Sequence, residues 1–451
     1  MRIIIIGAVA AGTSAATKAR RNNPDAEIVI YERDSDISYS GCGMPYYISG
    51  EIQNYSDIVP RDAAFFKRKY NVDVRTSNEV LSINTKEKTV EIKDLSADRV
   101  FTDKYDKLIV ATGASAFIPS IKGADKQHTF TLRNVANMNR IIEFYERNSP
   151  KTATVIGSGY VGLEICESLV KLGIRVTVVE ILPHVTPGLD DDIAIHVQEH
   201  LEENGVKVHT GQTVVEITDQ DVILADDSKV SSDMVIMATG VRPNTELAKS
   251  AGIELGVANA IKIDSKMRTN IEDVYACGDC TEHFNLVTGK PSYHPLGSTA
   301  NKAGRICGDS VTGGNMQFRG VLGTGIFRLF DLSIAQTGLS ERRAKEEGYD
   351  TVVISHTKPN KPVSVGGETM VIKAIADRSN GRLLGAQIVG KDGVDKRIDV
   401  IGTAITFGAV AEDLFHLDLA YSPPFATTKD PVTYTGMILD SVISKGKPKK
   451  S

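Results

Sequence analysis

Cys42 is the residue whose type and surroundings are best suited to chemistry. It lies in the segment SGCGMP, residues 40–45, where a glycine on each side lets another group approach the backbone closely. A helix that follows the cysteine would lower the pKa of its thiol through the positive end of the helix dipole. No second cysteine lies at a CxxC or CxxxxC spacing, so Cys42 is expected to act alone. A buried structural cysteine is the alternative, which the polar neighbours Ser38, Tyr39 and Ser40 make less favoured.

The segment GSGYVG, residues 157–162, predicts a dinucleotide site. It follows an apolar strand, opens a helix, and is followed by an acid, Glu180, at the end of the next strand. In this motif Gly157 makes the tight turn, Gly159 lets a pyrophosphate approach the backbone, and Gly162 lets the helix pack on the strand. A carboxylate at Glu180 would hydrogen-bond a ribose 2′-hydroxyl, which favours NADH over NADPH. A glycine-rich turn without a ligand is the less favoured alternative.

The segment GAVAAG, residues 7–12, is a degenerate copy of the same motif. Val9 stands where the second glycine usually lies. Glu32 supports the interpretation because it ends the following strand, where a carboxylate can hold an adenosine ribose. The sequence therefore predicts two dinucleotide sites.

The segment CGDC, residues 277–280, has the spacing of a redox dithiol. However, residues 269–279 are expected to form a short strand that runs into a helix, with Asp279 as the polar group at the turn. Asp279 is then better placed to bind a flavin ribityl hydroxyl, which leaves both cysteines of this segment as packing residues. Cys166 and Cys307 lie in segments expected to be helical and are also assigned to the core.

The elements that must position these residues form two βαβ units. The first has strands expected at residues 2–6 and 27–31 around a helix at 13–22, and the second has strands at 152–156 and 175–179 around a helix at 163–172. Their apolar runs are continuous, as in parallel strands buried on both faces. The sequence ATG closes both units, at residues 111–113 and 238–240.

From about Gly320 the pattern changes to short strands, expected at residues 352–356, 370–375 and 384–389, and a helix near 400–407. The predicted fold class is therefore α/β: two Rossmann-like dinucleotide-binding domains, one inserted in the other, and a C-terminal α+β domain. The predicted limits are 1–112 with 241–319 for the first domain, 113–240 for the inserted domain and 320–445 for the last.

Composition narrows the class of protein. A chain of 451 residues is long enough for about three domains, and a net charge of -5 gives no sign of nucleic-acid binding. Five cysteines are an odd number, which argues against a disulfide framework and for a reducing compartment. No apolar run is long enough to span a membrane, so a cytoplasmic protein without a membrane or nucleic-acid partner is expected.

Together these motifs resemble the pyridine nucleotide-disulfide oxidoreductase superfamily over residues 1–445. The resemblance is to its single-cysteine branch, which contains CoA-disulfide reductases, NADH oxidases and peroxidases, and persulfide and polysulfide reductases. It also rests on the segments ATGVRP (238–243), YACGD (275–279), PLG (295–297), ANK (300–302) and AYSPPFATTKDP (420–431). The resemblance implies FAD in the first domain, NADH in the inserted one with NADPH as the alternative, and a homodimer formed by the last. The loop from Tyr421 to Asp430 would complete the active site of the partner subunit.

The resemblance also implies a set of site residues. The catalytic residues would be Cys42 and Tyr421. Substrate, which could include coenzyme A, would meet Lys18, Arg20, Arg21, Ser38 and Phe425. The cofactors would be bound by Gly7, Ala11, Gly12, Glu32, Arg33, Val80, Ala111, Thr112, Gly113, Gly157, Gly159, Tyr160, Glu180, Gly240, Asp279, Pro295, Leu296 and Ala300. No metal site is expected.

Within the branch, one position separates the activities. Peroxidases and water-forming oxidases of this group carry a histidine in the first glycine loop, where this chain has Ala10. Lys18, Arg20 and Arg21 resemble the basic residues that meet CoA phosphates in CoA-disulfide and persulfide reductases, although a solvated helix face is an equally good interpretation. Two positions depart from the reductase pattern: residues 361–367 contain no tyrosine, and Phe425 replaces a tyrosine, which leaves Tyr421 as the only phenol of its loop.

Three hypotheses follow. The leading one is an FAD-dependent NAD(P)H oxidoreductase that reduces a disulfide, persulfide or polysulfide through Cys42, whose thiolate forms a mixed disulfide with the substrate. The second is an NADH oxidase in which Cys42 cycles through a sulfenic acid and oxygen is the acceptor. The third is a redox sensor or flavin-dependent binding protein with slow turnover. The sequence leaves the physiological acceptor open.

Overall fold

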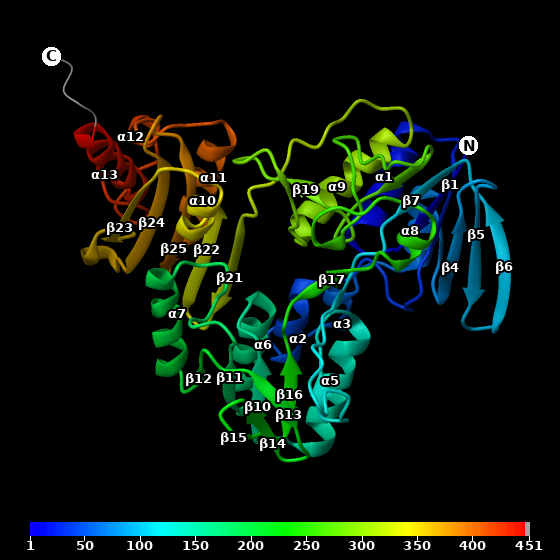
Figure 1. Cartoon of the computed structure of the whole chain (residues 1–451), viewed down its shortest axis with the longest axis horizontal. Coiled ribbons are helices and arrows are strands. Elements are labelled where there is room, and N and C mark those ends of the chain that lie inside the picture. Colours follow the sequence, from blue (N-terminus) through cyan, green and yellow to red (C-terminus); the bar gives the residue numbers. More distant parts are fainter. Residues whose placement is uncertain (447–451) are drawn as a thin grey trace.

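The computed structural model describes residues 1–446, and its chain folds into three lobes, each built around its own sheet (Figure 1). The first sheet is parallel, in the order β18-β7-β1-β2-β3. Its strands are β1 (Arg2–Ile6), β2 (Glu27–Tyr31), β3 (Asp73–Arg75), β7 (Lys107–Val110) and β18 (Val274–Ala276). The strands are apolar on both faces because helices cover both, as a parallel sheet requires.

Two helices that lie far apart in the sequence pack tightly in this lobe, α1 (Ala10–Asn22) and α9 (Gly297–Ser310). A Cβ atom at Gly304 or Gly308 of α9 would collide with the backbone of Ala11 or Ala15 of α1. These glycines therefore allow the two helices to approach to backbone contact, which brings both helix N-termini to the carboxyl edge of the sheet.

The second lobe repeats this plan. Its parallel sheet has the order β12-β11-β10-β16-β9. The strands are β9 (Thr129–Phe130), β10 (Thr152–Ile156), β11 (Arg175–Val179), β12 (Lys207–His209) and β16 (Met234–Met237), and the helices are α5 (Val135–Asn148), α6 (Tyr160–Lys171) and α7 (Asp191–Glu203). Each of the two lobes also carries a three-stranded antiparallel sheet: β4 (Asn78–Asn84), β5 (Thr89–Asp94) and β6 (Arg99–Lys104) in the first, β13 (Val214–Ile217), β14 (Asp221–Leu224) and β15 (Lys229–Ser231) in the second.

The two chain crossings between these lobes lie side by side. They form a two-stranded antiparallel ribbon of β8 (Ala114–Ala116) and β17 (Val241–Pro243), in which Val241 pairs with Ala116. Each crossing follows an ATG segment, and Gly113 and Gly240 both have a positive φ, +68° and +99°. A glycine is needed there because other residues adopt this backbone conformation only at a cost.

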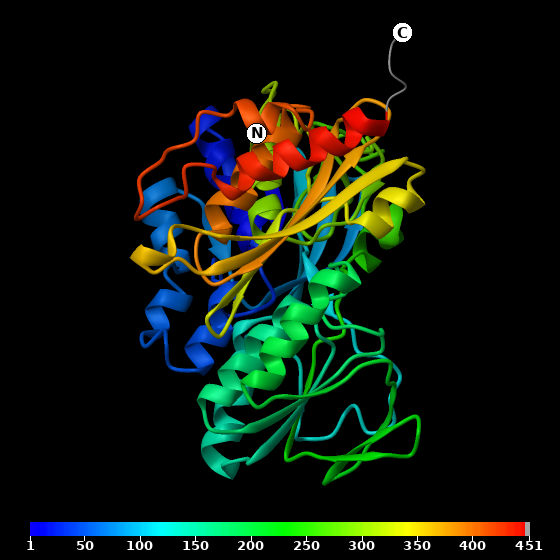
Figure 2. The ribbon, with the colours of Figure 1, turned by 90° about the vertical axis from the view of Figure 1, so that its left-hand side faces the viewer.

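The third lobe is an antiparallel sheet in the order β21-β22-β25-β24-β23. Its strands are β21 (Gly325–Leu329), β22 (Leu332–Gly338), β23 (Thr351–Pro359), β24 (Thr369–Asp377) and β25 (Leu383–Gly390). Helix α13 (Pro431–Gly446) lies across this sheet in Figure 2, and α11 (Val394–Thr406) packs on β22 and β25. The remaining elements are short: α2 (Met44–Ile48), α3 (Tyr55–Ile58), α4 (Ala63–Tyr70), α8 (Glu246–Ser250), α10 (Glu341–Glu346), α12 (Asp413–His416), β19 (His283–Phe284), β20 (Pro291–Ser292) and three 3-10 turns, at Gly41–Gly43, Val257–Asn259 and Val363–Val365.

The structure corrects four predicted elements. Both helices that follow the glycine motifs begin about three residues earlier than expected, since the last turn of each motif is already helical. The helix expected near residues 400–407 is α11, which begins at Val394. The prediction of a helix directly after residues 269–279 is wrong: β18 is followed by a turn closed by Thr281 N–H and Gly278 O, and the next helix, α9, begins only at Gly297.

The search for a membrane span gives a negative result for the described chain: none of its helices combines the length and the apolar character that crossing a bilayer requires.

Candidate active site

The first glycine turn joins β1 to α1 and has no room for side chains. Gly7 has a φ of +106°, and a Cβ atom on it would collide with the carbonyl oxygen of Ala111 at the end of β7. A Cβ atom on Gly12 would in turn collide with the carbonyl oxygen of Gly7. Both glycines are therefore required by the close approach of the turn, the helix and the neighbouring strand.

The second turn, between β10 and α6, separates two kinds of glycine. A Cβ atom on Gly157 would lie 2.5 Å from the carbonyl oxygen of Ala238, and one on Gly162 would collide with Gly157. A Cβ atom on Gly159 would meet nothing within 4 Å. The protein itself does not need Gly159 to be small, which leaves open space at the N-terminus of α6 where a pyrophosphate would be held.

In each unit, the acidic residue that follows the second strand accepts a hydrogen bond from the backbone of the glycine turn. Glu32 accepts hydrogen bonds from the backbone N–H groups of Ala8 (2.8 Å) and Asp34 (3.1 Å). Glu180 does the same with Ser158 (2.9 Å) and Leu182 (3.0 Å). Both carboxylates are buried, and burial raises the pKa of Glu32. Each unit thus has a carboxylate at the same position beside its glycine turn. This position is suited to binding a ribose in each unit.

Asp279 lies between the first two lobes, where Arg133 Nη2 donates to its carboxylate at 2.6 Å. The Nε of the same arginine donates to the carbonyl oxygen of Ala114. The neighbouring Gly278 has a φ of +88°, and its added Cβ atom would lie 2.7 Å from that of Ala11 and 3.9 Å from that of Ala300. The loop at 278–279 therefore joins the N-terminal turns of α1 and α9, which brings the predicted FAD residues of three distant segments together.

The cysteines of CGDC are both buried, as are Cys166 and Cys307, so the prediction that these four are packing residues is in keeping with their placement. The Cys280 thiol donates to the carbonyl oxygen of Cys277 at 3.4 Å, and burial raises its pKa to about 12. A thiol with so high a pKa is a poor nucleophile, which does not favour the dithiol interpretation.

Cys42, in contrast, is exposed and lies in the 3-10 turn Gly41–Gly43 just before α2. The expectation that its thiol pKa is lowered is wrong for the chain by itself. Although the residue as a whole is exposed, protein atoms crowd its sulfur, and this partial burial raises that pKa. The negative charge of Glu164 raises it further, while Arg133 lowers it and Asp279 raises it less. The α2 helix is only five residues long, so its dipole is small.

The basic residues of α1 do not all face the expected substrate entrance. Lys18 forms an ion pair with Asp309 at 3.1 Å, and Arg20 donates to the backbone carbonyl oxygens of Tyr70 and Asn71, both at 2.9 Å. These two predicted substrate residues therefore join α1 to its neighbours within the lobe, Lys18 to α9 and Arg20 to the C-terminal end of α4.

Arg21 alone of the three lines a cleft, of about 250 Å³. Two further arginines, Arg61 and Arg305, line it too, and the sequence analysis missed both because they come from segments far from α1 in the chain. The other lining residues are Thr13, Ser14, Thr17, Phe66, Tyr70 and Asn301. Three guanidinium groups beside hydroxyl and amide side chains form a site suited to phosphate groups.

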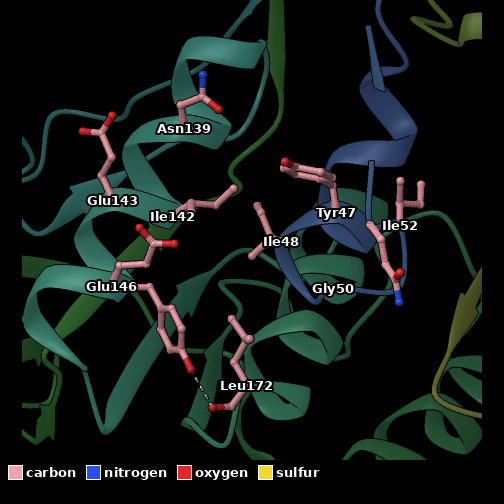
Figure 3. A pocket seen from close by; sticks show the side chains of 11 residues that line it. Tyr47, Ile48, Gly50, Ile52, Asn139, Ile142, Glu143, Glu146 and Leu172 are labelled. Carbon is pink, nitrogen blue, oxygen red and sulfur yellow. Dashed lines mark hydrogen bonds between the residues drawn. The ribbon is translucent and has the colours of Figure 1, made fainter. Parts of the chain in front are cut away.

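A larger groove, of about 470 Å³, lies between α2 and α5 and is drawn in Figure 3. Ile48 and Ile142 face each other across it, and Glu143 and Glu146 stand on α5 at its rim. None of the predicted site residues lines this groove. Size alone therefore does not identify the site.

The other predicted residues are distributed as follows. Thr112 Oγ1 donates to the carbonyl oxygen of Asn244 (2.7 Å), and Tyr160 O–H accepts from Gln336 of the third lobe (2.7 Å). Pro295, Leu296, Ser38 and Val80 are half-buried, and Arg33 is exposed. Tyr421 and Phe425 are 52% and 70% exposed on the third lobe, so a single chain leaves them free for contact with another molecule.

Comparison with known proteins identifies the family of the chain. Residues 1–303 match the pyridine nucleotide-disulphide oxidoreductase family, and residues 326–431 match the dimerisation domain of that family. The protein belongs to this family. It is a flavin-dependent NAD(P)H oxidoreductase with FAD and a nicotinamide dinucleotide as cofactors, and the dimerisation domain supports a homodimer. The predicted family, fold class and enzyme class are confirmed.

Three similar proteins have different activities in their names. An NADH oxidase of Methanocaldococcus jannaschii is 36% identical over 96% of this chain and 97% of that protein. A CoA-dependent NAD(P)H sulfur oxidoreductase of Pyrococcus furiosus is 34% identical over 97% and 99%. The structure of an NAD-dependent persulfide reductase from A. fulgidus has a TM-score of 0.96 at 37% identity, covering 99% of this chain and 84% of that one.

Proposed function

We propose that this oxidoreductase reduces the sulfur–sulfur bond of a disulfide or persulfide that carries coenzyme A, and that Cys42 makes the covalent contact. The observation that carries the proposal is the cleft lined by Arg21, Arg61 and Arg305. Coenzyme A contains a pyrophosphate and a 3′-phosphate, and arginine binds such groups with two parallel hydrogen bonds. The names of the sulfur-reducing relatives, one of them CoA-dependent, support the same substrate class.

The cofactors are assigned to the two glycine turns. FAD would lie on the first, with Gly7, Gly12, Glu32 and Asp279 around it, in a domain of residues 1–112 and 241–319. The nicotinamide dinucleotide would lie on the second, with Gly159 and Glu180, in the inserted domain of residues 113–240. The open space at Gly159 and the paired acids support this assignment.

The cofactor, Cys42 and the arginine cleft would each have a separate part in the reaction. Bound FAD would accept a hydride from NAD(P)H and supply the two electrons that cleave a mixed disulfide. Cys42, as a thiolate, attacks one sulfur of the substrate, forms the mixed disulfide and expels the other sulfur as a thiolate. The arginine cleft holds the nucleotide part of the substrate and fixes the distance of its sulfur from Cys42.

The test is NAD(P)H oxidation with CoA disulfide, CoA persulfide, inorganic polysulfide, hydrogen peroxide and oxygen as acceptors. Cys42→Ser is expected to abolish turnover of every sulfur acceptor. Arg21→Gln and Arg305→Gln are expected to raise KM about tenfold for the CoA substrates. They should leave KM for polysulfide unchanged, because polysulfide carries no phosphate group that these arginines could bind. Arg99→Gln, on the exposed strand β6, is the charge-matched control. Full activity of Cys42→Ser with the sulfur acceptors would refute the proposal.

An NADH oxidase is the second candidate, since the relative from Methanocaldococcus jannaschii carries that name at 36% identity. The same assay separates the two functions. Oxygen uptake that equals NADH consumption, with no increase when CoA disulfide is added, would favour the oxidase.

A further inference from the structure

A buried serine of the second glycine turn joins Glu180 to the loop that follows it. Ser158 is 0% exposed, and its hydroxyl donates to Glu180 Oε2 at 2.6 Å. The oxygen of the same hydroxyl accepts a hydrogen bond from the backbone N–H of Thr186 at 3.1 Å. The Thr186 N–H, the Ser158 hydroxyl and the Glu180 carboxylate therefore form a chain of hydrogen bonds among three buried residues.

The loop of residues 181–189 is held partly by this serine. Thr186 has a φ of +53°, in the left-handed region, which is costly for a β-branched residue. Such a conformation persists only where the surrounding contacts hold it. The Thr186 carbonyl oxygen accepts from Leu189 N–H at 2.9 Å, and its N–H donates to the Ser158 hydroxyl. The hydroxyl thus stabilises the loop beside the Glu180 carboxylate.

The first glycine turn lacks this serine. Ala8 stands at the equivalent position there, and within residues 1–446 Glu32 accepts hydrogen bonds from backbone N–H groups alone. Glu180 also accepts from two backbone N–H groups, and the Ser158 hydroxyl adds a third bond. A carboxylate has about four lone-pair sites. Three of the sites of Glu180 are therefore occupied, and the one that remains, on Oε1, can accept from a ligand.

The remaining site suits the ribose of NADH better than the 2′-phosphate of NADPH. A ribose 2′-hydroxyl donates a hydrogen bond to a carboxylate, whereas a 2′-phosphate brings negative charge against it. The loop of residues 181–189 contains no lysine or arginine that would neutralise this charge. Its one histidine, His184, pairs with Asp191 at 2.9 Å. Arg342 of the third lobe contacts the same loop, but its guanidinium donates to the carbonyl oxygen of Pro187.

We propose that Ser158 is a positioning residue that sets the preference for NADH over NADPH. Its hydroxyl fixes the Glu180 carboxylate in the orientation that accepts the 2′-hydroxyl and repels the 2′-phosphate, because a hydrogen bond to a charged group is short and directional. The inference rests on the proposed placement of the nicotinamide dinucleotide on the second glycine turn. It does not depend on which compound accepts the electrons.

The test measures the dissociation constants of NAD⁺ and NADP⁺ for the FAD-bound enzyme by isothermal titration calorimetry. These oxidised nucleotides bind without turnover, so no electron acceptor is needed. Ser158→Ala is expected to lower the ratio of the NADP⁺ constant to the NAD⁺ constant about tenfold, since it removes one hydrogen bond to a charged group. The variant should fold, because Ala8 occupies the same position beside Glu32 in the first unit.

Ser232→Ala is the matched control. Ser232 is 1% exposed in the same lobe, and its hydroxyl donates to the carbonyl oxygen of Met234 at 2.7 Å, at the edge of the sheet opposite the glycine turn. Its loss should lower Tm and leave the ratio unchanged. Glu180→Gln removes the charge itself, so adding Ser158→Ala to it should change the ratio no further.

A ratio that stays unchanged in Ser158→Ala, while Tm falls as in Ser232→Ala, would overturn the inference and leave the serine a structural role alone. So would a ratio that falls further when Ser158→Ala is added to Glu180→Gln, because the serine would then act without the carboxylate. If Glu180→Gln alters neither dissociation constant, the placement of the dinucleotide on the second turn is wrong, and the inference fails with it.

Discussion

Two glycines of the second glycine turn are small for different reasons. Gly157 has a φ of +99° and almost touches Ala238, whereas Gly159 has an ordinary φ of −70° and faces open space. Gly157→Ala is expected to lower the free energy of unfolding by about 1–2 kcal/mol from backbone strain alone. Gly159→Ala is expected to fold as wild type and to raise KM for NADH about tenfold, because its methyl group occupies the space of the pyrophosphate.

Thermal unfolding without nucleotide and steady-state kinetics distinguish the two effects. A Gly159→Ala variant with a lowered Tm and an unchanged KM would show that the open space has another purpose. Gly173→Ala tests the strain separately, since Gly173 has a φ of +80° but lies at the far end of α6, away from the turn.

Among the elements, α11 holds two loops through one buried side chain. Arg397 is 1% exposed, and its guanidinium donates to Asp430 at 2.8 and 3.1 Å and to the carbonyl oxygen of Asn360 at 2.7 Å. Arg397→Met would leave the buried Asp430 with only the more distant Lys396 ammonium, at 4.0 Å, as a cation, at a cost of about 3 kcal/mol. The double variant Arg397→Met with Asp430→Asn should regain part of that loss. Chemical denaturation of wild type and of the two variants measures the free energy of unfolding, and equal losses in the single and double variants would contradict this assignment.

The elements also show what a sequence can and cannot predict here. Four strands of the parallel sheets, β1, β2, β10 and β11, were predicted to the residue, because continuous apolar runs bounded by glycine or charge leave little choice. The start of α1 was missed since its first turn coincides with the glycine motif. The arginine cleft could not be predicted: Arg305 meets Arg21 through the packing of α9 on α1, and Arg61 comes from the segment just before α4.

On the scale of the whole molecule, the third lobe is fixed to the second but presents an apolar surface outward. The Lys373 ammonium of β24, nearly buried, pairs with Asp192 (2.6 Å), Glu341 (2.8 Å) and Asp190 (3.3 Å), and so joins β24 to the start of α7. Phe407 is 79% exposed and Phe425 is 70% exposed on the same lobe. The match of this lobe to a dimerisation domain makes these exposed aromatic side chains candidates for the contact between subunits.

If the loop that carries Tyr421 and Phe425 completes the site of the other subunit, each active site needs two chains. Cys42→Ser and Phe425→Asp should then each be inactive with CoA disulfide, for reasons that reside on opposite subunits. When the two variants are unfolded together and refolded as an equal mixture, half of the dimers are mixed. A twofold axis gives each mixed dimer one site with Cys42 and Phe425 both intact, so activity should return to about a quarter of wild type. Activity that stays at the background of the separate variants, with mixed dimers present by native mass spectrometry, would place both residues in one chain's site.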